Sequence, residues 1–161
     1  MRILFVTTYY APDGGATATL LTRLATMLAA RGYEVTVLAP MPHYPHRRIR
    51  DDYRGRFTMS ETLDGVRVVR VWLWTTPSNR MSRRLISQVS LMFALLIRGV
   101  FMRRPDVFFV ESQPVFTGFA GQALAFLKRR RYVLDVSDLW PDHLLTVGGL
   151  AHTGSDRALN I

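Results

Sequence analysis

The sequence predicts an α/β fold in which a parallel sheet carries helices on both faces. Short apolar runs rich in β-favouring residues alternate with longer runs whose apolar residues recur at helical spacing. The chain also opens with a strand, turn, helix, strand unit over residues 1–40. Such units form parallel sheets, and ligands bind beyond the carboxyl ends of their strands.

The first unit can be divided from its residue pattern. Residues 2–8 form an apolar run typical of a strand, residues 17–31 have helical periodicity, and residues 34–39 are a second strand. Gly32 lies where a helix C-terminal glycine belongs. The turn at 10–15 is therefore expected at the ligand-binding edge of the sheet.

Gly14 and Gly15 stand in that turn, directly before the helix. Glycine lets backbone N–H groups approach a ligand closely, and the helix N-terminus adds unpaired donors and a positive dipole end. The turn thus favours a phosphate or another anion. The alternative is a simple strand-to-helix turn in which Asp13 or Thr17 caps the helix.

A proline-rich loop at 40–46 follows the second strand. Its three prolines exclude helix and predict a stiff segment in which His43, Tyr44 and His46 overlook the same cleft as Gly14. Two histidines on one loop lack a third ligand, so no metal site is expected. His43 could act as an acid, a base or a hydrogen-bond partner for a hydroxyl, or it could simply pack on the loop.

The next segment combines polar residues with a valine-rich run. Residues 53–64 contain polar and turn residues, and Gly65 leads into a strand over 66–74. Valines and arginines alternate imperfectly along this strand. We therefore expect it near a sheet edge, with Arg67 and Arg70 reaching solvent.

Residues 83–104 are the most hydrophobic segment. The longest unbroken apolar run, 91–97, is far shorter than the roughly 20 residues needed to span a bilayer. Arginines bracket both ends, which is compatible with a helix lying on an anionic membrane. The favoured interpretation is a crossover helix buried mainly against the sheet.

The remaining elements continue the alternation. Residues 106–111 are a strand, 115–130 a helix and 132–136 a strand, which opens into the segment 137–143. The basic residues 128–131 suit the C-terminal dipole of the helix. Small residues permit this helix to approach the sheet closely; they are Gly118, Ala120, Gly121, Ala123 and Ala125.

Composition limits the class of protein. A chain of 161 residues with 48% hydrophobic and 20% charged residues is a globular domain. The absence of cysteine excludes disulfides and thiolate chemistry. No secretion signal is recognisable, so a cytoplasmic protein is expected. The net charge of +9, almost all from arginine, favours anionic partners such as nucleic acid, phospholipid headgroups or nucleotide phosphates.

Several motifs in order carry a resemblance to a known family. They are the N-terminal strand, Pro-Asp-Gly-Gly at 12–15, Arg-Gly-Tyr-Glu-Val-Thr-Val at 31–37, Pro-His-Tyr-Pro at 42–45 and Asp-Leu-Trp-Pro-Asp at 138–142. Together they resemble the N-terminal half of glycosyltransferase family four. Within it, the chain is similar to the subgroup that builds bacterial surface polysaccharides, such as the fucosamine and colanic acid transferases. The resemblance covers nearly all of residues 1–161.

The resemblance implies one half of a GT-B enzyme, in which two Rossmann-like domains face each other across a cleft. The N-terminal domain binds the acceptor, the C-terminal domain binds a nucleotide-sugar, and transfer proceeds without a metal or another cofactor and with retention at the anomeric carbon. The sequence ends at Ile161, before any donor-binding domain. We therefore expect a fragment or a half completed by another chain, with little or no transfer activity alone.

Site residues follow from the same resemblance. Gly14 and Gly15 match the glycine turn that approaches the donor diphosphate. Asp138 matches an aspartate that could orient or deprotonate the acceptor hydroxyl, or stabilise positive charge on the transferring sugar; the alternative is an Asx turn or helix cap. His43 is the second catalytic candidate. The acceptor cleft is expected to include Tyr44, Glu111, Asp135 and Trp140.

The expected partners are a nucleotide-sugar, a lipid-linked or saccharide acceptor and an anionic membrane at the inner face, without nucleic acid. A dinucleotide-dependent oxidoreductase would need Gly-x-Gly-x-x-Gly and an acidic residue closing the second strand, where residues 38–40 offer none. A phosphoacceptor receiver would need acids where Thr7 and Thr8 stand. A non-catalytic membrane- or anion-binding module stays the alternative.

Overall fold

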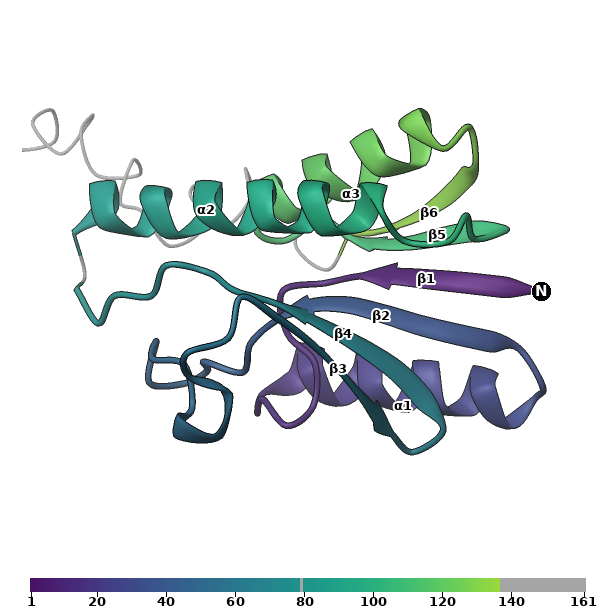
Figure 1. Ribbon diagram of the computed structural model, residues 1–161, viewed down its shortest axis with the longest axis horizontal. Helices are drawn as coiled ribbons and strands as arrows, with labels where there is room; N and C mark the ends of the chain where they lie inside the picture. Colours follow the sequence, from purple (N-terminus) through teal and green to yellow (C-terminus); the bar gives the residue numbers. More distant parts are fainter. Residues whose placement is uncertain (79, 137–161) are drawn as a thin grey trace, which may run out of the picture.

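A computed structural model of the chain describes residues 1–78 and 80–136. A six-stranded sheet with the order β3-β4-β2-β1-β5-β6 forms its centre (Figure 1). The strands are β1 (Arg2–Val6), β2 (Glu34–Pro40), β3 (Thr58–Leu63), β4 (Val66–Val71), β5 (Val107–Glu111) and β6 (Arg131–Asp135). The helices are α1 (Ala16–Ala30), α2 (Met81–Val100) and α3 (Val115–Leu127), with a 3₁₀ turn at Asp51–Tyr53.

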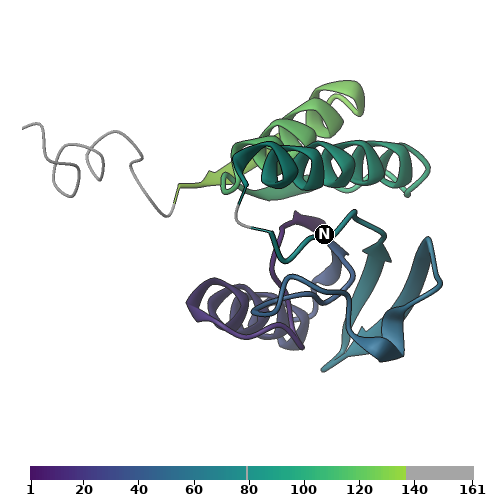
Figure 2. The same cartoon turned by 90° about the vertical axis from the view of Figure 1, so that its left-hand side faces the viewer.

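The helices cover both faces of the sheet, as predicted. Figure 2 shows α1 on one face and α2 and α3 together on the other. The two faces are used because α1 connects β1 to β2 in one direction along the sheet, whereas α2 and α3 lead in the other direction to β5 and β6. The strand order reverses at β1, so the carboxyl end of β1 is the favoured place for a ligand.

The core follows from strand alternation. Ile3 and Phe5 of β1 pack on the α1 side, whereas Leu4 and Val6 pack on the α2 and α3 side. All four side chains are buried, because helices cover both faces. This explains why β1 reads as a continuous apolar run instead of an alternating one.

One strand was not predicted from the sequence. β3 pairs antiparallel with β4 along its whole length, and its side chains alternate between exposed and half-buried positions. Asp64 and Gly65 connect the two strands with φ of 49° and 79°, as a two-residue hairpin turn requires. β3 therefore takes the edge position that the sequence had suggested for β4.

This edge strand makes the prediction for Arg70 wrong. Arg67 is exposed as expected, but Arg70 is 0% exposed. Its Nε donates to Glu61 Oε1 of β3 at 2.8 Å. The guanidinium can be buried because β3 brings a carboxylate to meet it.

Helix packing confirms two expectations. Gly32 has a φ of 84° after α1, and the next amide, Tyr33 N–H, returns to the Leu28 carbonyl at 3.2 Å. On α3, a Cβ at Gly121 would lie 2.4 Å from Val110 Cγ1, so only glycine allows this approach to β5.

The hydrophobic segment around α2 is only partly buried. Leu91, Leu95 and Gly99 face the sheet or α3, in line with a crossover helix. The outer side of α2 exposes large apolar side chains, namely Leu85, Ile86, Phe93 and Ile97. Among the described residues, no helix combines the length and apolarity that a bilayer crossing requires.

Candidate functional site

Two loops meet at the carboxyl edge of the sheet, and Asp13 joins them. Asp13 is 8% exposed, and its Oδ1 accepts hydrogen bonds from the backbone N–H groups of His43 (2.8 Å) and Tyr44 (2.9 Å). The glycine turn after β1 is thereby tied to the proline-rich loop after β2. Asp13 does not cap α1, whose N-cap residue is Gly15 with no side-chain hydrogen bond.

Arg70 of β4 forms hydrogen bonds to the backbone of the same two loops. Its guanidinium donates to the carbonyl of Ala11 in the first loop and, at 3.4 Å, to that of Pro40 at the start of the second. It also lies 5.9 Å from the ring centroid of Tyr10. A single buried cation therefore positions both segments that sequence reasoning had assigned to the site.

Gly14 and Gly15 are exposed at the start of α1. Gly15 has a φ of 96°, a conformation that glycine adopts without strain. The first turn of α1 contains no acidic residue. No carboxylate in that turn would repel an anion at the positive dipole end of α1, and the diphosphate contact stays a prediction.

A cavity of about 310 Å³ lies beside these loops. It combines aromatic rings, hydroxyl groups and two arginines, a set suited to stacking on a sugar ring, bonding its hydroxyls and pairing with phosphate. Five segments supply the walls, namely the loops that follow β1, β2, β4 and β5 and the helix α2. The lining residues are Thr8, Tyr9, His43, Tyr44, Arg47, Leu73, Thr75, Thr76, Arg84, Ser87, Gln88, Leu91 and Pro114.

His43 lines this cavity with a defined tautomer. Its Nδ1 lies 3.0 Å from the carbonyl oxygen of Met41, which can only accept. Nδ1 therefore carries the proton, and Nε2 is left as an acceptor. The Tyr9 ring stacks on the imidazole at 5.7 Å between centroids.

Burial decides the charge of His43. The side chain is 11% exposed, and this burial lowers the pKa of His43 below its ordinary value. The Asp13 carboxylate, whose Oδ2 lies 3.9 Å from Nδ1, opposes the effect without reversing it. At neutral pH the imidazole is therefore uncharged and can accept a proton or a hydrogen bond.

Tyr44 joins the glycine turn to the cavity. It lines the cavity, and its ring lies edge-on to Tyr9 with 5.5 Å between centroids. The same ring borders Gly15, since a Cβ there would lie 3.4 Å from Tyr44 Cε1. The structure thus brings together Gly15, His43 and Tyr44, three of the residues that the sequence analysis selected.

Glu111 lies beneath the site and is not part of the cavity wall. The residue is 2% exposed, and its Oε2 accepts hydrogen bonds from Thr7 Oγ1 (2.5 Å) and the Thr8 N–H (2.8 Å). Burial, with a smaller contribution from the Asp135 carboxylate, raises the pKa of Glu111 to about 7 against the opposing effect of these two bonds. Glu111 therefore joins the end of β5 to the end of β1.

The remaining predicted residues lie farther along the edge or beyond the described chain. Asp135 ends β6 in register with Glu111, and its backbone oxygen accepts from the Ser112 N–H at 2.9 Å. Asp138 and Trp140 lie outside the described residues. Their assigned roles stay predictions.

Sequence reasoning missed the contribution of α2 to the cavity. Arg84, Ser87 and Gln88 recur at helical spacing and continue into buried Leu91 on one side of the helix. This polar stretch at one end of an apolar stripe was a signal in the sequence. Tyr9, three residues after the end of β1, was also missed.

Potential metal ligands do not gather at this site in the described part of the chain. Within residues 1–78 and 80–136, no three side chains of His, Asp or Glu gather as a metal ion would require.

Comparisons with known proteins agree with this architecture. Residues 14–160 match the family described as glycosyl transferase 4-like domain. Among solved structures, the chain is similar to sucrose-phosphate synthase from Thermosynechococcus elongatus, with a TM-score of 0.62 and 13% sequence identity. The match covers 95% of this chain and 37% of that one, and at this identity it shows the fold alone. No curated protein matches the sequence significantly.

Proposed function

The chain belongs to the glycosyl transferase 4-like domain family, and from that premise we propose that it is the acceptor-binding half of a retaining glycosyltransferase. The acceptor is a lipid-linked saccharide, and the product is a cell-surface polysaccharide. This assigns the chain to one half of a GT-B fold, in keeping with its similarity to 37% of a larger synthase. The donor-binding half is a further domain or a partner chain.

The observation that carries the proposal is the cavity beside His43. Its hydroxyl and aromatic side chains suit a saccharide, and Arg47 and Arg84 suit the phosphate of a lipid carrier. A neutral imidazole on the wall can orient or deprotonate the attacking hydroxyl through Nε2. Asp138 is proposed to share this task or to stabilise charge on the transferring sugar.

The glycine turn is proposed to face the donor. Gly15 borders the ring of Tyr44, so a diphosphate at the α1 N-terminus would lie next to the acceptor cavity. The unpaired N–H groups of α1 would bind its charge without a metal ion. The nucleotide-sugar itself would be held mainly by the other half.

A peripheral membrane contact is proposed for the outer side of α2. Large apolar side chains are exposed there, with arginines at both ends of the helix. This pattern is typical of helices that lie in the interface of an anionic bilayer. It would place a lipid-linked acceptor close to the cavity, whose wall includes Arg84 of the same helix.

The test compares two histidines of one loop in the protein that includes the donor-binding half. His43→Gln should lower kcat with a lipid-linked acceptor by roughly 100-fold or more, since general acid–base groups contribute at least that much. His46→Gln is the matched control, because His46 is exposed and does not line the cavity. Equal activities of the two variants would contradict the role of His43.

A second variant separates the roles of the two catalytic candidates. Asp138→Ala should also abolish most turnover while leaving acceptor binding measurable by calorimetry. The isolated 161-residue chain should bind the acceptor and show little or no transfer. Turnover by this chain alone would overturn the proposed division of labour.

The alternative is a non-catalytic membrane- or anion-binding module. The exposed apolar side of α2 is the observation in its favour. It would be preferred if anionic vesicles bound the chain while saccharide acceptors left the His43 resonances unchanged.

A further inference from the structure

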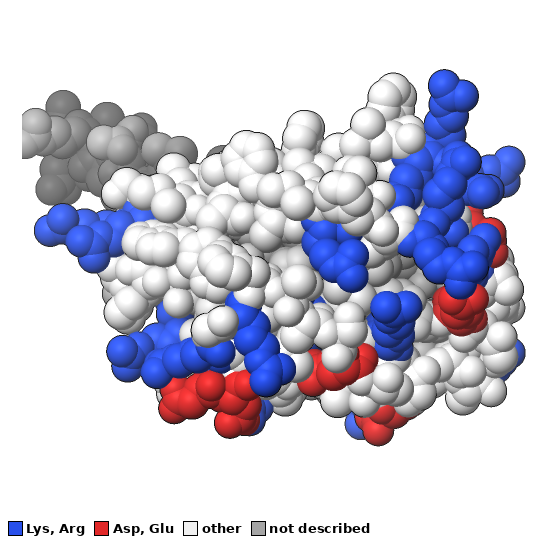
Figure 3. Space-filling model, viewed as in Figure 1, with Lys and Arg blue, Asp and Glu red and all other residues white. Residues whose placement is uncertain are grey.

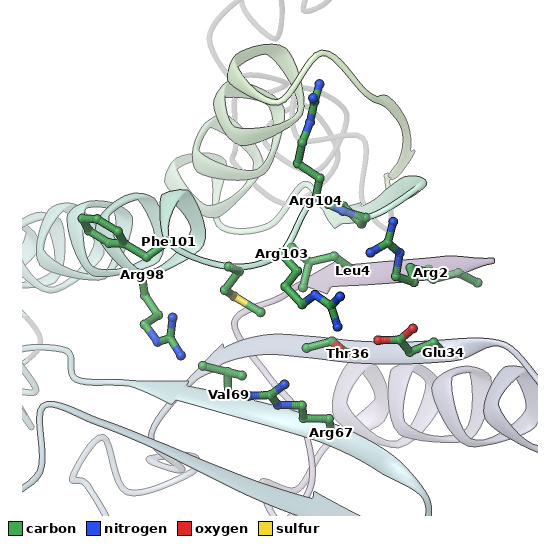
Figure 4. Close-up of a pocket in the computed structure, with 13 residues that line it drawn as sticks. Arg2, Leu4, Glu34, Thr36, Arg67, Val69, Arg98, Phe101, Arg103 and Arg104 are labelled. Atoms are coloured by element: carbon green, nitrogen blue, oxygen red, sulfur yellow. The ribbon is translucent and has the colours of Figure 1, made fainter.

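A second cavity lies at the opposite edge of the sheet, where the strands begin. Its volume is about 240 Å³, and it lies between the C-terminal end of α2 and the first residues of β1, β2 and β4 (Figure 4). Thr36 and Arg67, which are register partners, form part of its floor. The proposed transfer reaction uses no residue of this cavity.

Three arginines reach this cavity from three different segments. Arg67 comes from β4, Arg98 from the last turn of α2, and Arg103 from the loop that follows α2. Figure 4 shows the side chains of Arg98 and Arg103 descending from the helix layer toward the sheet, where Arg67 lies. The arrangement therefore depends on tertiary structure and not on a run of charges in the sequence.

These three guanidinium groups lack partners within the described residues. No hydrogen bond or ion pair joins Arg67, Arg98 or Arg103 to a carboxylate there. The other two arginines at the cavity differ, since Arg2 lies 3.9 Å from Asp106 Oδ1 and Arg104 donates to the Lys128 carbonyl. Glu34 is the one carboxylate among the lining residues in the described chain.

The end of α2 does not account for the cluster. The terminal carbonyl of α2 already has a cation, because Lys128 Nζ donates to Val100 O at 3.0 Å and also to Met102 O of the following loop at 2.7 Å. Arg98 and Arg103 are therefore not needed to complete this helix terminus. Five arginines line this cavity, and Glu34 is the one carboxylate among its described lining residues, so the local charge is positive. A bound anion would offset this charge.

The size and chemistry of the cavity define the ligand. Its volume lies below the roughly 300 Å³ at which pockets for drug-sized ligands begin, so the cavity suits a single charged group. Guanidinium groups bind phosphate oxygens with paired N–H donors. Figure 3 shows further basic side chains gathered at this end of the same face, near the start of β1.

We propose that Arg67, Arg98 and Arg103 bind a phosphate group at the amino-terminal edge of the sheet. The phosphate belongs either to a phospholipid headgroup or to a soluble polyphosphate. Phe101, which lines the cavity and is 80% exposed, favours the headgroup because its ring could enter the apolar part of a bilayer. This site does not depend on the transfer reaction proposed above.

The experiment uses the 161-residue chain and two matched triple variants. Arg67→Gln/Arg98→Gln/Arg103→Gln removes the proposed site. Arg23→Gln/Arg48→Gln/Arg56→Gln removes the same charge from exposed positions outside the cavity. One arm measures co-sedimentation with vesicles of phosphatidylcholine with and without 30% phosphatidylglycerol, and the other titrates pyrophosphate while amide resonances are followed.

Binding to the anionic vesicles should weaken at least about tenfold in the site variant, since each arginine near a membrane contributes measurably, and much less in the control. If the site variant binds anionic vesicles more weakly than the control and pyrophosphate causes no amide shifts, the phosphate belongs to a phospholipid headgroup. A saturable pyrophosphate shift at Thr36, Arg67, Arg98 and Arg103, lost in the site variant, assigns a soluble ligand. Either outcome supports the site.

The proposal is overturned if both triple variants behave alike in both arms. It is also overturned if pyrophosphate shifts only the amides of Gly15 and its neighbours. Thermal unfolding of each variant checks folding. If the site variant does not fold, the wild-type amide shifts decide the question by themselves.

Discussion

The two edges of the central sheet hold arginine side chains in opposite ways. At the carboxyl edge, Arg70 is fully buried and bonded to Glu61, Ala11 and Pro40. Three residues earlier on the same strand, Arg67 points to the other face at the amino edge, where no carboxylate within the described residues pairs with it. One arginine serves the fold, and the other is open to a ligand.

This contrast has a physical cause. A buried cation is stable only with its donors satisfied, so Arg70 fixes the segments that accept from it. An exposed cation keeps its hydration and can exchange water for an anion at little cost. The carboxyl edge is therefore held in one arrangement, which suits the transfer reaction that we propose, whereas the amino edge suits the reversible phosphate binding that we propose.

The largest expected effect comes from exchanging each arginine for methionine. Arg70→Met leaves Glu61 and two carbonyls without their donor, and it should lower the free energy of unfolding by about 3 kcal/mol. Arg67→Met is the matched control on the same strand and should change it by about 0.5 kcal/mol or less. Urea denaturation measures both. Similar losses of stability in the two variants would contradict the claim that Arg70 stabilises the fold and Arg67 does not.

The second expected effect is a pH dependence of stability caused by Glu111, the buried carboxylate at the carboxyl edge. The pKa of Glu111 is about 7 in the folded chain against an ordinary value of 4.5. Between these pH values, folded Glu111 keeps a proton that the unfolded chain releases, so stability falls as pH rises from about 4.5 to 7 and then levels. We expect a total change of about 3 kcal/mol from this group, since each pKa unit corresponds to about 1.4 kcal/mol.

The Glu111→Gln variant isolates this titration. Gln keeps an acceptor for Thr7 and Thr8 but has no proton to lose, so its stability relative to wild type should increase with pH over the same interval. Glu34→Gln removes one exposed carboxylate at the amino edge and controls for net charge. A constant difference between Glu111→Gln and wild type from pH 4.5 to 7 would contradict the raised pKa.

The smallest expected effect concerns the two glycines of the turn before α1. Gly15→Ala forces a side chain into a φ of 96° and should lower the free energy of unfolding by about 1 kcal/mol. Gly14→Ala meets open space without such a φ, so its stability should change by about 0.5 kcal/mol or less. Thermal denaturation measures both. A larger loss in Gly14→Ala would show that the turn is held differently.

Much of the fold could be predicted because it depends on local patterns. The run 2–8, the helical spacing of 17–31 and the terminal glycine Gly32 all correspond to observed elements. β3 was missed because its alternating polar residues read as a loop, although Asp64 and Gly65 are a hairpin signal. That omission then produced the wrong expectation for Arg70.

The candidate site was predictable only in part. The proximity of Gly15, His43 and Tyr44 could be predicted because turn residues after parallel strands share one edge, whereas their roles stay predictions. The roles of Asp13 and Glu111 as buried connections were not found, because a sequence does not show which carboxylate is shielded from water. Burial is a property of the packed chain.

The sequence by itself determined the alternation of strands and helices, and with it the edge at which the glycine turn and the His43 loop meet, because periodicity and turn chemistry act over a few residues. Only the tertiary structure decided the use of each charge. Arg67 and Arg70 belong to one short strand, yet the sheet sends them to opposite faces and gives a carboxylate to just one. Whether a charge is paired or open depends on neighbours distant in sequence.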